Sequence, residues 1–79
     1  MVFSRKQIEF MKNELGVDED KLMSVTEDEW DELRLSVFDI EVDELMAIHR
    51  QGKDIDRNMT ERAVIACSIV DMEYSDVVA

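Results

Sequence analysis

Apolar residues recur every three or four positions along most of the chain, a spacing that predicts helices. The first helix is expected over 5–15. Ser4 and Gln7 have the capping-box spacing at its start, and Gly16 stands where a left-handed residue often ends a helix. Residues 17–25 form a connector, with room for one short helical turn in 18–24.

A second, longer helix is expected over 27–51, with Thr26 and Glu29 forming a capping box and Gly52 just past its end. The apolar and acidic residues that alternate over 38–43 are a strand signal, but no other segment alternates in a way that would pair with it. We therefore expect one helix, with a bend near 39–41 left open. Its inward stripe consists of Trp30, Leu33, Val37, Ile40 and Ile48, with Phe38 and Leu45 at the margin.

The last helix is expected over 59–74, with Asn58 and Glu61 as its capping pair. It is apolar over more than half of its circumference, which predicts a central position in the fold. The tail after it is expected to fray, unless Val77 and Val78 dock. The sequence thus predicts an all-α fold, a small bundle of three main helices in a single domain spanning 1–79.

Composition supports a folded, helical chain. Of 79 residues 46% are hydrophobic, two are glycine and none is proline, which favours helices with short connections. The single cysteine, Cys67, cannot form an internal disulfide. The start MVFSRKQIEF lacks the apolar stretch of a signal peptide, and the longest apolar run, AVIACSIV at 63–70, is too short to span a membrane. A cytoplasmic protein without a membrane partner is expected.

Parts of the chain resemble a group of small acidic helical proteins from Gram-positive bacteria and their mobile elements. The matching features are the run Phe3–Lys12, the pair Leu15–Gly16, the segment Thr26–Trp30, and a late helix with Cys67, Ile69, Val70 and Asp71. Residues 38–58 differ from that pattern. The group has no assigned activity, so the resemblance implies helices and a bacterial or phage origin and transfers no functional residue.

Catalytic and metal chemistry find little support in the residues. Neither Asp18 nor Asp39 starts a calcium-loop pattern, because the required glycine and glutamate positions are wrong. His49 and Cys67 are single and far apart; His49 fits a helix end, and Cys67 lies in an apolar run with no base at helical spacing. We expect no catalytic residue, no metal, no cofactor and no enzymatic activity.

The net charge of −11 is concentrated in the middle of the chain, where residues 18–44 hold twelve acids and two bases. Such a field repels nucleic acid and anionic lipid and attracts basic partners. On a helix over 27–51, four acids project from one side with axial gaps of about 6, 10 and 6 Å, which resembles the repeat of DNA phosphates. These candidate partner-binding acids are Asp28, Glu32, Asp39 and Asp43.

Two functions follow from this pattern. The favoured one is a non-enzymatic protein that acts through protein–protein interaction, with Trp30 and Phe38 as its candidate apolar interface and a homodimer left open. In it, Arg34 stacks on Trp30 or Phe38. The alternative is a DNA-mimic inhibitor that uses the four acids to occupy the basic groove of a nucleic-acid-binding protein.

Overall fold

The structure, a computed structural model, describes residues 2–78, which form helices and their connections. The elements are α1 (Arg5–Leu15), α2 (Glu19–Met23), α3 (Glu27–Arg50), α4 (Glu61–Val70) and α5 (Tyr74–Val77). Helices make up 70% of the described chain, which has no strand. The prediction of an all-α bundle with three main helices is therefore confirmed, and α3 is helical throughout 38–43.

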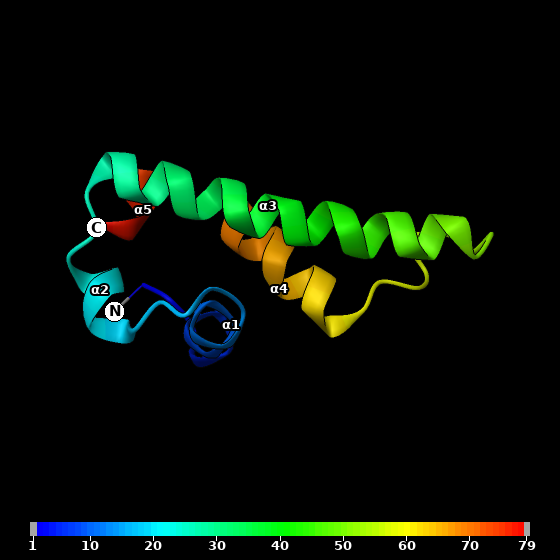
Figure 1. Cartoon of the computed structure of the whole chain (residues 1–79), viewed down its shortest axis with the longest axis horizontal. Coiled ribbons are helices and arrows are strands. Elements are labelled where there is room, and N and C mark those ends of the chain that lie inside the picture. The colour runs from blue at the N-terminus through cyan, green and yellow to red at the C-terminus, as the bar shows by residue number, and fades with distance from the viewer. Residues whose placement is uncertain (1, 79) are drawn as a thin grey trace.

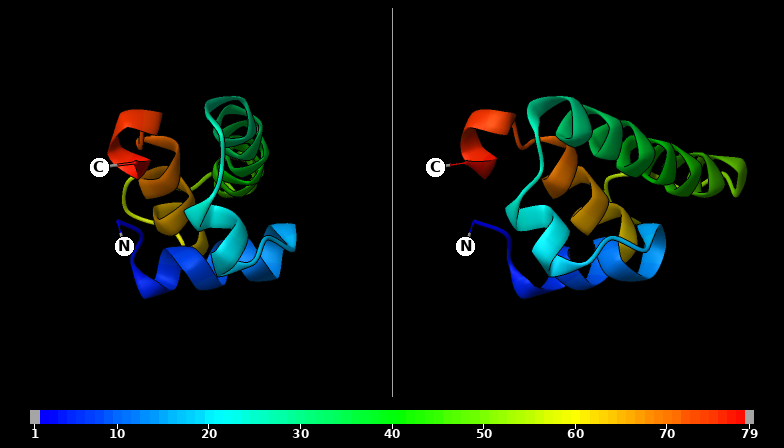
Figure 2. Two further views of the ribbon diagram at one scale, coloured as in Figure 1. Left: turned by 90° about the vertical axis from the view of Figure 1, so that its left-hand side faces the viewer. Right: turned by 60° about the vertical axis from the view of Figure 1, so that its left-hand side comes forward.

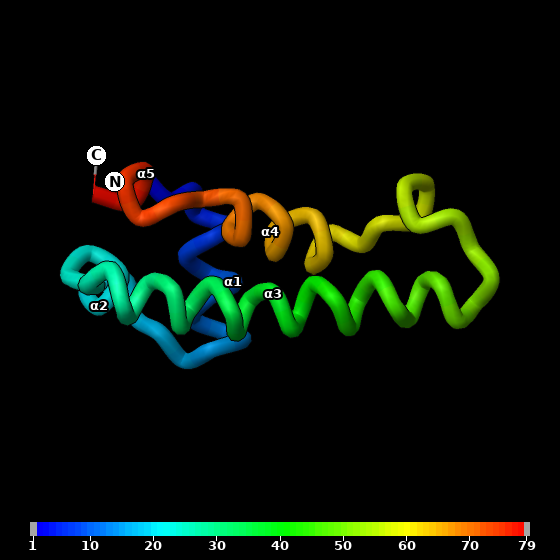
Figure 3. The backbone as a smooth tube through the Cα atoms, turned by 90° about the horizontal axis from the view of Figure 1, so that it is seen from above, coloured from blue at the N-terminus to red at the C-terminus, as the bar shows by residue number. Residues whose placement is uncertain are grey.

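Helix α3 runs along the whole length of the molecule, which measures 41 × 21 × 20 Å (Figure 1). Helix α4 returns beside it, and α1 crosses below α4 (Figures 1 and 3). Helices α2 and α5 lie near the N-terminal end of α3, whereas its C-terminal end and the connector over 51–60 extend beyond α4 (Figure 3). The elements therefore gather at one end of the molecule.

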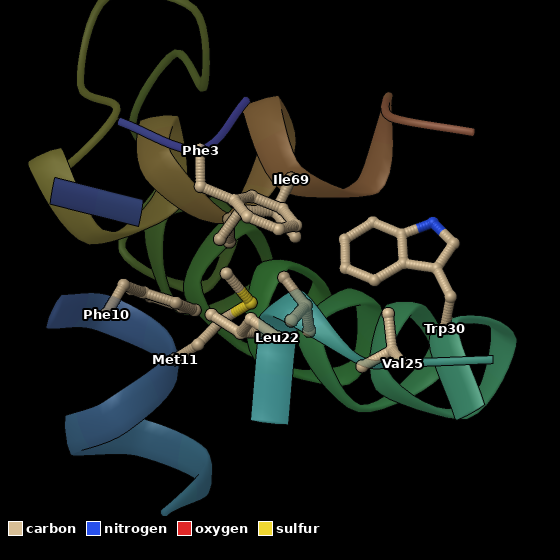
Figure 4. Packing of buried hydrophobic residues seen from close by; sticks show 9 residues of the cluster. Phe3, Phe10, Met11, Leu22, Val25, Trp30 and Ile69 are labelled. Atoms are coloured by element: carbon tan, nitrogen blue, oxygen red, sulfur yellow. The ribbon is translucent and has the colours of Figure 1, made fainter. Parts of the chain in front are cut away.

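The hydrophobic core lies at that end and takes side chains from four helices (Figure 4). Trp30 of α3 and Met11 of α1 are fully buried, and the ring of Phe3 packs 5.5 Å from that of Trp30. Burial of large apolar side chains is the main stabilising contribution, roughly 1.5–3 kcal/mol for each. The buried cluster consists of Phe3, Phe10, Met11, Leu22, Val25, Trp30, Val37, Ala66 and Ile69.

The caps predicted for α1 and α3 are confirmed. The hydroxyls of Ser4 and Thr26 accept backbone hydrogen bonds from Gln7 and Glu29, and both capping boxes are complete. At the C-terminal ends, Gly16 (φ 69°) and Gly52 (φ 72°) adopt the left-handed conformation that favours glycine. Helix α3 ends at Arg50, one residue before the predicted end.

The bounds predicted for the last helix, 59–74, are wrong at both ends. Thr60 caps the start of α4, since its hydroxyl accepts from the backbone N–H of Ala63 at 3.1 Å. Asn58 instead donates to the carbonyl of Asp54 at 2.7 Å and closes a turn in the connector. The helix therefore begins at Glu61, two residues later than predicted.

Side chains from α3 hold the segment that follows α4 in a non-helical path. Arg34 donates to the carbonyl of Val70 from Nε at 3.2 Å and from Nη2 at 2.9 Å, and Trp30 Nε1 donates to the carbonyl of Met72 at 3.1 Å. The carbonyls of Val70 and Met72 thus have hydrogen-bond donors from α3 at and beyond the point where α4 ends, Val70. Tyr74–Val77 then form α5 instead of a frayed tail, with Val77 packed against the core, while Ala79 lies outside the described residues.

Candidate functional site

The outward side of α3 carries a row of apolar side chains that the rest of the described chain leaves partly exposed. Its members are exposed although they are large and apolar: Leu35 by 66%, Phe38 by 45%, Val42 by 38% and Met46 by 42%. They follow one another at intervals of three, four and four residues. We call these four residues the outer stripe.

The outer stripe faces away from the core because of helical geometry. At about 100° per residue, Leu35 and Val42 lie about 120–160° around α3 from the buried Trp30, Val37 and Ile48, and Phe38 lies about 80–100° from them. Seen end-on, α3 has α4 and the other helices on one side and none on the other (Figure 2). Among residues 2–78, half of the eight exposed large hydrophobic side chains belong to the stripe, so the exposure is concentrated on this face.

Of the two residues predicted to form an apolar interface, Trp30 and Phe38, the structure corrects the first. Trp30 is 0% exposed; its ring packs against Phe3, and its N–H is bonded to the carbonyl of Met72. It is a core residue, and a partner cannot reach it without opening the fold. Phe38 is exposed, and its role as an interface residue stays a prediction.

The four acids singled out from the sequence lie together along one edge of the outer stripe. Asp28, Glu32, Asp39 and Asp43 are all exposed. Within the described chain, none of them forms an ion pair with a lysine or arginine, in contrast to several other acids of the molecule. We call them the acidic edge. The structure therefore brings these four residues to one face, as the helical spacing predicted.

Arg34 lies on the opposite edge of the outer stripe. Stacking on Trp30 or Phe38 was one expectation for it, but its guanidinium instead caps the C-terminal end of α4 through the carbonyl of Val70. The carbonyls at a helix end carry partial negative charge, which favours a cation there. Beside it is a hollow of about 340 Å³, lined by Asp31, Arg34, Leu35, Phe38 and Val70.

Other acids of α3 are engaged in the fold. Glu29 pairs with Lys21 and accepts the backbone N–H of Thr26, and these contacts lower its pKa from 4.5 to about 2. Glu44 accepts from Arg62 at 2.6 Å and from Thr60 at 3.1 Å, and the Arg62 contact is the main cause of its lowered pKa. These carboxylates stabilise packing between elements and are not part of the outward surface.

Cys67 of α4 and His49 of α3 are the single cysteine and the single histidine of the sequence. Burial, with the nearby carboxylates of Glu41 and Asp71, raises the pKa of the half-buried Cys67 thiol, whereas a nucleophilic cysteine needs a lowered pKa. His49 is exposed in the last turn of α3. In the part of the chain that the structure describes, no group of three or more His, Cys, Asp or Glu residues could hold a metal ion.

Three members of the outer stripe, Leu35, Val42 and Met46, were missed in the sequence. The signal was present, since Leu35, Phe38, Val42 and Leu45 have the alternating three- and four-residue spacing of a coiled-coil seam. The spacing alone did not single out this row, because α3 carries two apolar rows and the row that includes Trp30 has more apolar members. Which of two rows a helix buries depends on its neighbours.

Two general comparisons, with membrane-spanning helices and with known proteins, complete the description of the chain. No helix among residues 2–78 is both long enough and apolar enough to cross a membrane. Comparisons of the chain with protein-family models, curated proteins and solved structures give no match.

Proposed function

We propose that this protein is a non-enzymatic interaction protein that binds another protein through the outer face of α3. The observation that carries the proposal is the outer stripe, a continuous apolar row bordered by the acidic edge. Protein interfaces commonly have an apolar centre and a polar rim. Contiguous exposed apolar surface on a small chain is typical of a binding site.

Solubility alone explains the acidic edge but not the outer stripe. Leucine or phenylalanine gains roughly 1.5–3 kcal/mol when it is fully removed from water. Leu35 and Phe38 keep about half of their surface in water, so a covering partner would gain a substantial part of that free energy. A helix that served only as a solvated face has no need of four such residues in register.

The test is a double variant, Leu35→Glu with Phe38→Glu, which puts charge on the stripe without disturbing a buried side chain. The matched control is Val64→Glu, because Val64 is an apolar residue of α4 with 51% exposure. Tagged wild type and both variants are used to capture proteins from a nuclease-treated lysate of the organism that carries the gene, followed by mass spectrometry. Their folding is compared by circular dichroism.

We expect a protein that wild type and the Val64→Glu control retain at high salt, and that the double variant loses while keeping its fold. Burial of apolar surface resists salt, in contrast to pairing between exposed charges. Equal capture by wild type and the double variant would contradict the proposal.

A second candidate, the DNA mimic, is favoured by the acidic edge, whose members are exposed and form no ion pair within residues 2–78. Its partner would be a nucleic-acid-binding protein with a basic groove, attracted by long-range electrostatics. The test is Glu32→Lys with Asp39→Lys, against the control Asp20→Lys with Asp56→Lys of equal charge. We expect capture that falls steeply with salt and disappears only in the first pair; capture that both pairs retain would contradict this candidate.

A further inference from the structure

We infer that the occupant of the outer stripe is a second copy of this chain, with two α3 helices packed antiparallel about a twofold axis level with Ile40. The inference rests on the proposed function, because it takes the stripe to be a binding surface. It goes beyond that proposal in naming the partner and the register.

The first argument is the match between layers. A seam at heptad spacing along α3 consists of Asp28, Asp31, Leu35, Phe38, Val42, Leu45 and His49. With the axis at the level of Ile40, Leu35 lies opposite Leu45 of the second copy, and Phe38 lies opposite Val42. The apolar residues thus meet apolar residues in four successive layers, and Met46 flanks them.

The second argument is the charge of α3, which is opposite at its two ends. The first turns carry Asp28, Asp31 and Glu32, all exposed, and the last turn carries His49 and Arg50, also exposed. The antiparallel register places Asp31 opposite His49 of the second copy, nine residues from the axis on either side. In a parallel pair, the acidic first turns of the two α3 helices would lie side by side, and their like charges would repel.

The third argument is the hollow beside the stripe. It opens at the level of Leu35, next to Arg34 and Val70, and its walls are largely apolar. In the proposed register Leu45 of the second copy, which is half-buried in its own chain, reaches this level. An apolar side chain that enters a hollow at the edge of a flat helix face fixes the register, as knobs in holes do in coiled coils.

The proposed register also brings two like charges close together at the twofold axis, and this repulsion gives a way to recognise the register. Asp39 lies next to the axis, so its carboxylate approaches the same carboxylate of the second copy, and like charges at short distance repel. Removing this charge should strengthen the dimer more than removing a distant one. Only a residue next to the twofold axis lies close to its own copy, so this expectation applies to Asp39 in this register.

Sedimentation equilibrium of the full chain over the micromolar range tests the dimer. We expect wild type and Val64→Glu to approach the mass of two chains, and Leu35→Glu with Phe38→Glu to weaken association by about tenfold or more, which corresponds to 1.4 kcal/mol or more. Asp39→Asn should tighten association by a few-fold relative to Asp20→Asn, which changes the net charge equally. A wild type that stays a monomer throughout the range would overturn the inference.

A charge exchange tests the orientation. Asp31 and His49 are about 27 Å apart along one helix, so they cannot interact within one chain. We expect Asp31→Lys alone and His49→Glu alone to weaken association by about threefold, in the range of single charge pairs, and the combined variant to return to within about twofold of wild type. Effects that simply multiply in the combined variant would exclude this register.

The failure of this inference and that of the proposed function give different results. A monomer whose stripe variant still loses a different captured protein overturns the dimer and leaves the proposed function standing. A monomer whose stripe variant captures the same proteins as wild type overturns both.

Discussion

Glu29 takes part in two interactions at the start of α3, and the ion pair is the one that disappears when its charge is removed. Its carboxylate accepts the backbone N–H of Thr26 at 2.9 Å and also pairs with Lys21 of α2. A glutamine at this position keeps the oxygen that completes the capping box and removes the ion pair. The Glu29→Gln variant therefore removes the ion pair between α2 and α3 while the capping box is retained as a neutral hydrogen bond.

The lowered pKa of Glu29 predicts how stability depends on pH. Its pKa is about 2 in the folded chain, against an ordinary value of 4.5. A group with a lowered folded pKa contributes stability above its unfolded pKa and loses it as pH falls through the folded pKa. We therefore expect Glu29→Gln to melt below wild type at pH 6 and the difference in melting temperature to shrink between about pH 4.5 and 2.

The melting temperature by circular dichroism, measured across this pH range, checks the prediction. Glu27→Gln is a suitable control, because Glu27 is an exposed acid in the same first turn. A difference between wild type and Glu29→Gln that is independent of pH would show that the Lys21 contact contributes nothing.

At the scale of elements, local signals in the sequence predicted most helix ends, and long-range contacts decided the rest. The capping boxes at Ser4 and Thr26 and the glycines that end α1 and α3 act within a few residues, so their positions can be read directly from the sequence. The end of α4 at Val70 depends on Arg34, which is 36 residues away in the chain. No local pattern contains that information.

The start of α4 gives a direct test of the cap that the sequence misassigned. Thr60→Ala removes the hydroxyl that accepts from the N–H of Ala63 and donates to Glu44, and it should lower the free energy of unfolding by about 1 kcal/mol. Thr60→Ser, which keeps the hydroxyl, should lower it by much less. Urea unfolding of both variants checks this, and an equal loss in Asn58→Ala would favour the earlier start of the helix.

The candidate site was predicted in part. The acidic edge follows from the period of a single helix, and its four exposed members lie on one face as expected. The apolar half was misjudged, because the burial of Trp30 results from Phe3 and Met72, which come from opposite ends of the chain. The pairing of distant segments determined which apolar row of α3 remained outside.

At the scale of the whole molecule, one arginine links three helices. Arg62 of α4 bonds to Glu14 of α1 through Nε at 2.9 Å and to Glu44 of α3 through Nη1 at 2.6 Å. Its planar guanidinium can serve both carboxylates at once, which an ammonium group does less well. The network lies outside the main core and joins α1, α3 and α4 around it.

We expect Arg62→Met to lower the free energy of unfolding by about 1 kcal/mol, since the side chain is 44% exposed and solvent weakens its ion pairs. Arg62→Lys should retain part of this contribution. Urea unfolding at low salt and at about 1 M salt, where charges are screened within roughly 3 Å, checks the electrostatic origin. A loss that is identical at both salt concentrations would assign the effect to packing of the arginine stem.

The position of α4 between α3 and α1 also bears on the order in which the chain can fold during synthesis. Ala63, Ala66 and Ile69 are all fully buried, and they follow α1, α2 and α3 in the chain, so they are made last. Until they are in place, the side of α3 that carries Trp30 and Val37 lacks the part of its cover that α4 supplies, and the outer stripe on the other side is exposed as well. A nascent chain at this stage exposes more of the apolar surface of α3 than the folded chain does, and a chaperone that binds apolar segments has most to bind before α4 docks.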